Sequence, residues 1–162
     1  MKKKDNLTQK KNQTVKSDDF PLISIVVRTK NRNTLLQNAL DSLVSQSYTN
    51  LQVVLINDGG NDISELIQSY STKLRFKTIF NQQSVGRASA LNQGLISADG
   101  EWIGILDDDD IYLPGALESL IEFSRNSIAN AVYGKVEMLD FKDENNPKHL
   151  RFFDTTYNKD RF

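Results

Sequence analysis

Four consecutive aspartates carry the clearest chemical potential in this sequence. Asp107 to Asp110 directly follow the apolar run Trp102–Leu106, which has the length of a buried strand. Adjacent carboxylates repel by on the order of a few kcal/mol per close pair, so solvent, protonation or a bound cation must relieve the charge. Mg²⁺ and Mn²⁺ prefer carboxylate and phosphate oxygens. The run therefore predicts a divalent-metal site able to hold a diphosphate, although a solvated loop or helix start shows the same pattern.

Two further polar clusters are expected close to the acidic run. Thr29 to Arg32 and Asn57 to Gly60 each follow an apolar run typical of a buried strand. Ligands of open parallel sheets bind outside the carboxyl ends of the strands, where parallel topology would gather all three clusters. A carboxylate at Asp58 could accept hydrogen bonds from a nucleoside base or a ribose, or it could close its own loop as an Asx-turn.

A fourth candidate lies at the start of an expected helix. Gly86 to Ala90 combines small residues with Arg87. Helix N-termini and guanidinium groups both favour anions, so this segment suits a phosphate. A helix start with a solvated arginine would give the same pattern.

Alternating strand and helix patterns must position these residues. The order predicts an α/β fold, a Rossmann-like and mostly parallel sheet with helices on both faces. The expected strands are 22–27, 51–56, 75–80, 102–106 and 131–136, and the expected helices are 33–44, 63–70, 86–96 and one that has Pro114 in its first turn.

Composition narrows the class of protein. The net charge is −1, which gives no reason to expect a nucleic-acid partner, and there is no cysteine for a disulfide, a thiolate metal site or a nucleophile. No apolar run is long enough to span a bilayer, and the first apolar cluster begins only at Pro21. We therefore expect a cytoplasmic protein, which could still make peripheral contact with the inner face of the membrane.

Three segments are expected along the chain. Residues 1–19 are basic and almost without apolar side chains, which predicts a disordered tail. Residues 20–140 carry the strand and helix patterns and form the expected ligand-binding domain. Residues 141–162 are polar and have no clear pattern.

Five segments together resemble the family 2 glycosyltransferases, which have the GT-A fold. The resemblance is carried by their joint order and spacing; they are Ser24–Arg32, Leu40–Tyr48, Val54–Gly59, Gly86–Gly94 and Gly100–Asp110. It implies an inverting, metal-dependent transfer of a sugar from a nucleotide-diphosphate-sugar, usually UDP-linked, to an acceptor hydroxyl. The acceptor, a saccharide, a lipid-linked molecule or a protein, is left open.

The resemblance implies a nucleotide pocket outside the acidic run. Thr29 and the loop after it, with Asn31 and Arg32, resemble part of the nucleoside pocket. Asp58 resembles the residue that contacts the base, usually uracil, and Arg87 is expected to support the nucleotide.

Within the acidic run, Asp107 and Asp109 match the Asp-x-Asp element that contacts ribose and metal in the family. Asp108 and Asp110 make the register ambiguous. We therefore assign Asp107 and Asp108 to the nucleotide, and Asp109 and Asp110 to Mn²⁺ or Mg²⁺. In such enzymes an acceptor hydroxyl attacks, a carboxylate base takes its proton, and the metal stabilises the leaving diphosphate.

The sequence also departs from the family pattern. Arg28 and Lys30 stand where the family often has Pro and Tyr, and Leu91 stands where many members have Arg. No carboxylate from Asp140 onward lies in a matching motif, so the catalytic base is not identified. Residues 141–162 are expected to begin an incomplete acceptor-side region.

Two other functions fit part of the pattern. A module that binds a nucleotide-sugar without turnover, or a truncated fragment, would need no base. A nucleotidyltransferase would also combine a Rossmann-like sheet with Mg²⁺, but it normally carries a glycine-rich loop after the first strand, and the loop from Arg28 to Arg32 has no glycine.

Overall fold

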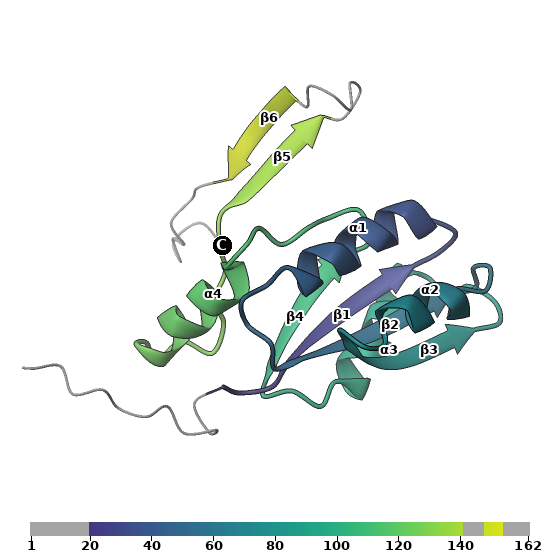
Figure 1. Ribbon diagram of the computed structural model, residues 1–162, viewed down its shortest axis with the longest axis horizontal. Helices are drawn as coiled ribbons and strands as arrows, with labels where there is room; N and C mark the ends of the chain where they lie inside the picture. Colours follow the sequence, from purple (N-terminus) through teal and green to yellow (C-terminus); the bar gives the residue numbers. More distant parts are fainter. Residues whose placement is uncertain (1–19, 141–147, 154–162) are drawn as a thin grey trace, which may run out of the picture. The chain divides into compact units, whose positions relative to one another are not determined.

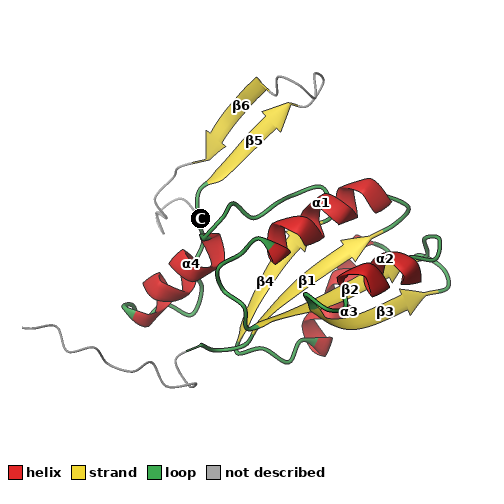
Figure 2. Ribbon diagram, in the orientation of Figure 1, coloured by secondary structure: helices red, strands yellow, loops and turns green. Residues whose placement is uncertain are grey.

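The computed structural model describes residues 20–140 and 148–153, so the expected tail at 1–19 and much of the region 141–162 lie outside the described residues. Figures 1 and 2 show the described helices and strands. In chain order they are β1 (Ile23–Thr29), α1 (Asn33–Val44), β2 (Leu51–Asp58), α2 (Ser64–Tyr70), β3 (Arg75–Asn81), α3 (Arg87–Ser97), β4 (Trp102–Asp107), α4 (Ala116–Arg125), β5 (Val136–Asp140) and β6 (Lys148–Phe153).

The first four strands form one sheet in the order β3-β2-β1-β4, and every pair of neighbours is parallel. This confirms the predicted α/β fold with a mostly parallel sheet. In the register, Thr29 lies beside Asn57, and Arg28 lies beside Asp107. The three polar clusters therefore meet at the carboxyl edge of the sheet, as predicted.

The two central strands are the most completely buried strands of the parallel sheet. All residues of β2 are buried, and so are all residues of β1 except Arg28, which is partly exposed. Strands buried on both faces read as continuous apolar runs, which explains why these two stood out in the sequence. Figure 1 shows α1 and α2 in front of the sheet and α3 behind it.

Helix α3 packs on the sheet through Ala90 and Gly94, both of which are buried. Ala90 belongs to a cluster with Val26 of β1 and with Val54 and Ile56 of β2. A Cβ atom at Gly94 would lie 2.3 Å from Cγ1 of Val26 and 2.7 Å from Cδ1 of Ile56. Gly94 is therefore required by the close approach of the helix to the sheet.

We expect Gly94→Ala to lower the free energy of unfolding by about 1–3 kcal/mol, because overpacking outweighs the better helix propensity of alanine. Urea denaturation measures the change. Asn92→Ala, at an exposed position of the same helix, is the control and should leave stability unchanged or slightly raised. An unchanged midpoint for Gly94→Ala would show that the helix can move away from the sheet at little cost.

The fifth predicted strand is wrong in both position and pairing. Residues 131–135 form no strand, and β5 begins only at Val136. It pairs antiparallel with β6 in a separate two-stranded sheet. The prediction failed because a strand is fixed by its partner, and the partner at Lys148–Phe153 lies in a polar stretch without a clear pattern.

The described residues divide into two compact units: one contains residues up to Leu40 and Thr49–Ile111, and the other contains Asp41–Tyr48 and residues from Tyr112 onward. The four-stranded parallel sheet and all predicted site residues lie in the first unit. In the second, Gln46 holds the start of α4, because its side chain donates to the carbonyl of Leu113 and accepts from the amide of Leu117. Helix α4 starts two residues after Pro114, later than predicted.

None of the helices in the described part of the chain combines the length and the apolar character needed to cross a membrane. The predicted boundaries of the ligand-binding domain, 20 and 140, stay predictions.

Candidate nucleotide and metal site

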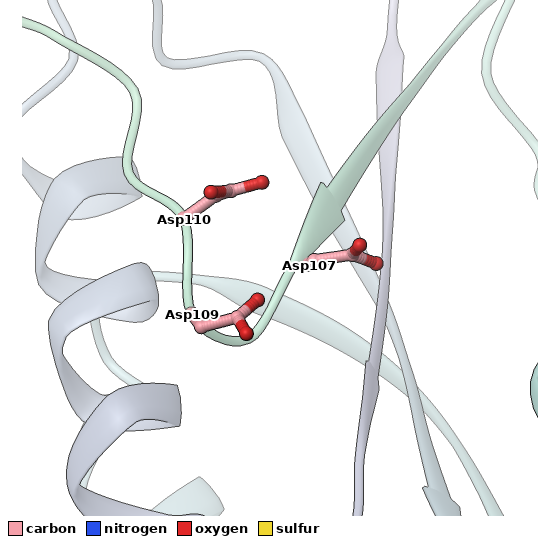
Figure 3. Close-up of side chains that lie close together, drawn as sticks. All are labelled: Asp107, Asp109 and Asp110. Atoms are coloured by element: carbon pink, nitrogen blue, oxygen red, sulfur yellow. The ribbon is translucent and has the colours of Figure 1, made fainter. Parts of the chain in front are cut away.

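The acidic run turns back on itself directly after β4. The amide of Asp110 donates to the carbonyl of Asp107 at 3.0 Å, which closes a tight turn. This turn places carboxylate oxygens of Asp107, Asp109 and Asp110 within 4.8 Å of one another (Figure 3). Three carboxylates gathered in this way match the oxygen ligands that Mg²⁺ and Mn²⁺ prefer, so the residues fit a divalent ion.

The structure does not divide the four aspartates into the two pairs that we assigned from the sequence, one pair for the nucleotide and one for the metal. Asp109 and Asp110, predicted as metal ligands, lie together with Asp107, which was assigned to the nucleotide. Asp108 does not belong to the cluster. Partial burial and then the charges of the other three aspartates raise the pKa of Asp110 above its ordinary value of 3.8. A cation would relieve this repulsion.

Asp108 is fully buried, with 0% of its surface exposed. Its Oδ2 accepts hydrogen bonds from the hydroxyl of Thr29 at 2.7 Å and from Nε of Arg32 at 3.1 Å. Its Oδ1 forms an ion pair with Nη2 of Arg32. The geometry therefore favours a structural role for Asp108, which ties the acidic turn to the end of β1, and its assignment to the nucleotide stays a prediction.

Arg32 connects the buried and the exposed parts of the acidic run. In addition to its contacts with Asp108, its Nη1 donates to Oδ2 of Asp109 at 2.9 Å. Partial burial alone would lower the pKa of Arg32, but the charges of Asp108 and Asp109 outweigh it and raise that pKa above its ordinary value. Arg32 therefore neutralises part of the acidic run and remains charged.

Arg28 makes a second ion pair with the run, one that the sequence did not predict. Both Nε and Nη2 donate to Oδ1 of Asp107, at 3.0 and 2.8 Å. Nη1 donates to the main-chain carbonyl of Arg87 at 3.3 Å. The sequence showed only that Arg28 departs from the family pattern at this position. Its partner Asp107 could not be predicted, because the contact depends on the register of β1 with β4.

Asp58 lies in a second polar cluster, at the end of β2. Its Oδ1 accepts from the side chain of Asn81 at 2.9 Å and from the amide of Val85 at 2.8 Å. Its Oδ2 accepts from the hydroxyl of Ser84 at 2.6 Å and from the amide of Gly86 at 3.2 Å. A carboxylate has about four lone-pair sites, so these donors nearly saturate it.

These hydrogen bonds change the acidity of Asp58. Burial raises its pKa, but the bonds from Ser84, Val85, Asn81 and Gly86 outweigh burial and lower the pKa to about 2. Asp58 is therefore charged at neutral pH and fixes the segment before α3. Sequence reasoning missed Asn81 and Ser84; the only signal was that one is a polar residue at the end of β3 and the other a polar residue in the loop that follows.

Asn57, and not Asp58, closes the loop after β2. Its Oδ1 accepts from the amide of Gly60 at 3.0 Å, and its Nδ2 donates to the carbonyl of Asn61 at 2.7 Å. The amide of Asn61 in turn donates to Oδ1 of Asn31, which has a φ of +56°. The loops after β1 and β2 are thus joined at the carboxyl edge, and the side chain of Asn57 makes the loop contacts that were considered for Asp58.

Arg87 is the first residue of α3 and is exposed. Its carbonyl accepts from Arg28, and the two residues before it are held by Asp58. The structure therefore links the acidic run to the start of α3 through Arg28 and Asp107. The support that Arg87 is expected to give to a nucleotide stays a prediction, as do the nucleotide contacts of Thr29, Asn31, Arg32 and Asp58.

Comparison with known sequences identifies relatives over most of the chain. The glycosyl transferase family 2 matches residues 24–162. An uncharacterised glycosyltransferase of Rickettsia felis is 34% identical over 128 residues, which is 75% of this chain and 21% of that protein. Glycosyltransferase GlyG of Streptococcus pneumoniae is 31% identical over 126 residues, which is 76% of this chain and 42% of that protein. The chain thus spans less than half of the length of these two relatives.

Solved structures with a similar fold include a mannosyltransferase. The crystal structure of S. aureus TarS 1–349 in complex with UDP superposes with a TM-score of 0.61 and 26% identity, over 65% of this chain and 32% of that one. The mannosyltransferase PcManGT of Pyrobaculum calidifontis in complex with GDP-Man and Mn²⁺ superposes with a TM-score of 0.51 and 26% identity, over 57% of this chain and 28% of that one. The sheet described above is the GT-A fold, and the chain belongs to glycosyl transferase family 2.

Proposed function

We propose that this chain binds a nucleotide-diphosphate-sugar, UDP-linked, and transfers the sugar to an acceptor hydroxyl with inversion in the presence of Mn²⁺ or Mg²⁺. The observation that carries the proposal is the acidic cluster of Asp107, Asp109 and Asp110. It lies where ligands of open parallel sheets bind, past the carboxyl end of β4.

The structural relatives support the donor and the metal. TarS has been crystallised with UDP and also with UDP-GlcNAc, and PcManGT with GDP-Man and Mn²⁺. UDP is therefore the first nucleotide to test, and GDP is the second.

Each cluster has a distinct part in the proposed reaction. Asp107, Asp109 and Asp110 would hold the divalent ion, which when bound supplies positive charge opposite the leaving diphosphate. The joined loops after β1 and β2 would form the wall of the nucleoside pocket, with Thr29 and Asn31. The proton of the acceptor hydroxyl requires a carboxylate base, and we assign none.

The test is a thermal-shift series with UDP, GDP, CDP, ADP and TDP, each with and without Mn²⁺. A ligand at 100 times its dissociation constant stabilises a fold by about 2.7 kcal/mol, which such an assay detects. A shift that needs both one nucleotide and Mn²⁺ would support the donor site. Release of that nucleotide from its sugar conjugates then separates turnover from binding alone. No shift with any nucleotide would contradict the proposal.

Asp109→Asn should weaken Mn²⁺-dependent binding of that nucleotide by about tenfold or more, because it removes one charged ligand from the cluster. Calorimetry with Mn²⁺ present measures the affinity. Glu101→Gln is the control: Glu101 is exposed and precedes β4, and the change removes the same charge. Equal affinities for the Asp109→Asn variant and the unmodified chain would exclude Asp109 as a ligand.

A further inference from the structure

Two arginines form ion pairs with members of the acidic cluster: Arg28 with Asp107, and Arg32 with Asp109. Of the two carboxylate oxygens of Asp107, Arg28 contacts Oδ1, and of those of Asp109, Arg32 contacts Oδ2. The second oxygen of each of these two carboxylates has no hydrogen-bond partner among residues 20–140. Each arginine thus takes one oxygen of a candidate metal ligand and leaves the other available.

The two guanidinium groups offset half of the four negative charges of Asp107 to Asp110. A divalent ion held by Asp107, Asp109 and Asp110 would share two of these carboxylates with Arg28 and Arg32. Like charges this close oppose one another, and the Arg28 side chain, only 24% exposed, is partly shielded from screening by salt. The geometry therefore works against a divalent ion that arrives alone.

A nucleotide diphosphate changes this balance. Its phosphate oxygens can share the divalent ion with the carboxylates, and they bring negative charge that offsets the arginines. Arg28 is well placed for this effect, because three hydrogen bonds hold its guanidinium group, two to Oδ1 of Asp107 and one to the carbonyl of Arg87.

We propose that Arg28 is a positioning residue that weakens binding of the free divalent ion, so that the metal binds mainly as its complex with the nucleotide diphosphate. The second half of this statement rests on the proposed function; the first half concerns the metal alone and does not.

The experiment is calorimetric titration of the full 162-residue chain with Mn²⁺, first alone and then with saturating UDP. Arg28→Gln should tighten binding of free Mn²⁺ by at least about tenfold, or about 1.4 kcal/mol. Arg28→Lys keeps the charge and should stay within about threefold of the unmodified chain. Lys77→Gln removes an exposed cation paired with Asp99 and should change nothing.

The UDP arm measures the coupling between the two ligands. UDP should strengthen Mn²⁺ binding in the unmodified chain. This factor should fall about tenfold in Arg28→Gln, because that variant already binds free Mn²⁺ about tenfold more tightly. If UDP has no effect on the unmodified chain, the proposed function fails, while the first arm still decides the role of Arg28.

Several results would overturn the proposal. Weaker or unchanged Mn²⁺ binding in Arg28→Gln would mean that Arg28 orients Asp107 or only stabilises the fold. Equal tightening in Arg28→Lys would show that charge is not the cause. Lack of Mn²⁺ binding in every variant would also contradict it. If Arg28→Gln does not fold, Arg28→Met keeps the apolar stem and carries the same expectation.

Discussion

Replacing Arg32 with methionine should lower the free energy of unfolding by about 3–5 kcal/mol, because it leaves Asp108 as a buried charge without its cation. Asp108 is fully buried, and the ion pair with Arg32 is supplemented by one hydrogen bond from Thr29. Thr29 alone cannot compensate the charge. Urea denaturation monitored by circular dichroism measures the loss.

A double-mutant cycle with Asp108→Asn separates this cause from a general loss of packing. Asparagine at position 108 carries no charge and can still accept the hydrogen bond from Thr29. The double variant Arg32→Met, Asp108→Asn should therefore be more stable, by about 1–3 kcal/mol, than the sum of the two single effects predicts. If the two single effects simply add, the buried ion pair does not explain the loss.

The sequence predicted the parallel sheet well because its central strands are buried on both faces. Such strands appear as mostly apolar runs, and the residues from Ile23 to Val27 and from Leu51 to Ile56 are of this kind, with one polar residue in each. The antiparallel pair β5 and β6 was not predictable in the same way. Its strands are short, and their pairing, not their composition, decides where they begin and end.

In the candidate site, too, the sequence predicted some residues and not others. The acidic run after β4 was visible in the sequence, and so was the polar residue Asp58 at the end of β2. The partners were not visible, because they depend on three-dimensional arrangement: Arg28 reaches Asp107 through the strand register, and Asp58 reaches residues 23–28 positions away. The orientation of Asp108 into the core is likewise a property of the turn and not of the acidic run itself.

Asp58→Asn should lower the free energy of unfolding by about 2–4 kcal/mol at neutral pH. An amide group has one oxygen where the carboxylate has two, so two of the four donors lose their acceptor. Ser84→Ala is the control, because it removes only one of these donors and should cost about 1 kcal/mol. Chemical denaturation of the three proteins measures both changes.

The same variant should show a characteristic dependence on pH. The pKa of Asp58 is lowered from 3.8 to about 2 in the folded protein, so its charged form contributes stability above pH 4 that is lost as pH falls toward 2. The gap in stability between the unmodified chain and Asp58→Asn should be constant from pH 7 to 5 and should narrow by about 2 kcal/mol between pH 4 and 2. A gap that stays constant down to pH 2 would mean that the four hydrogen bonds do not depend on the charge, and that Asp58 retains no energetic preference for its ionised form.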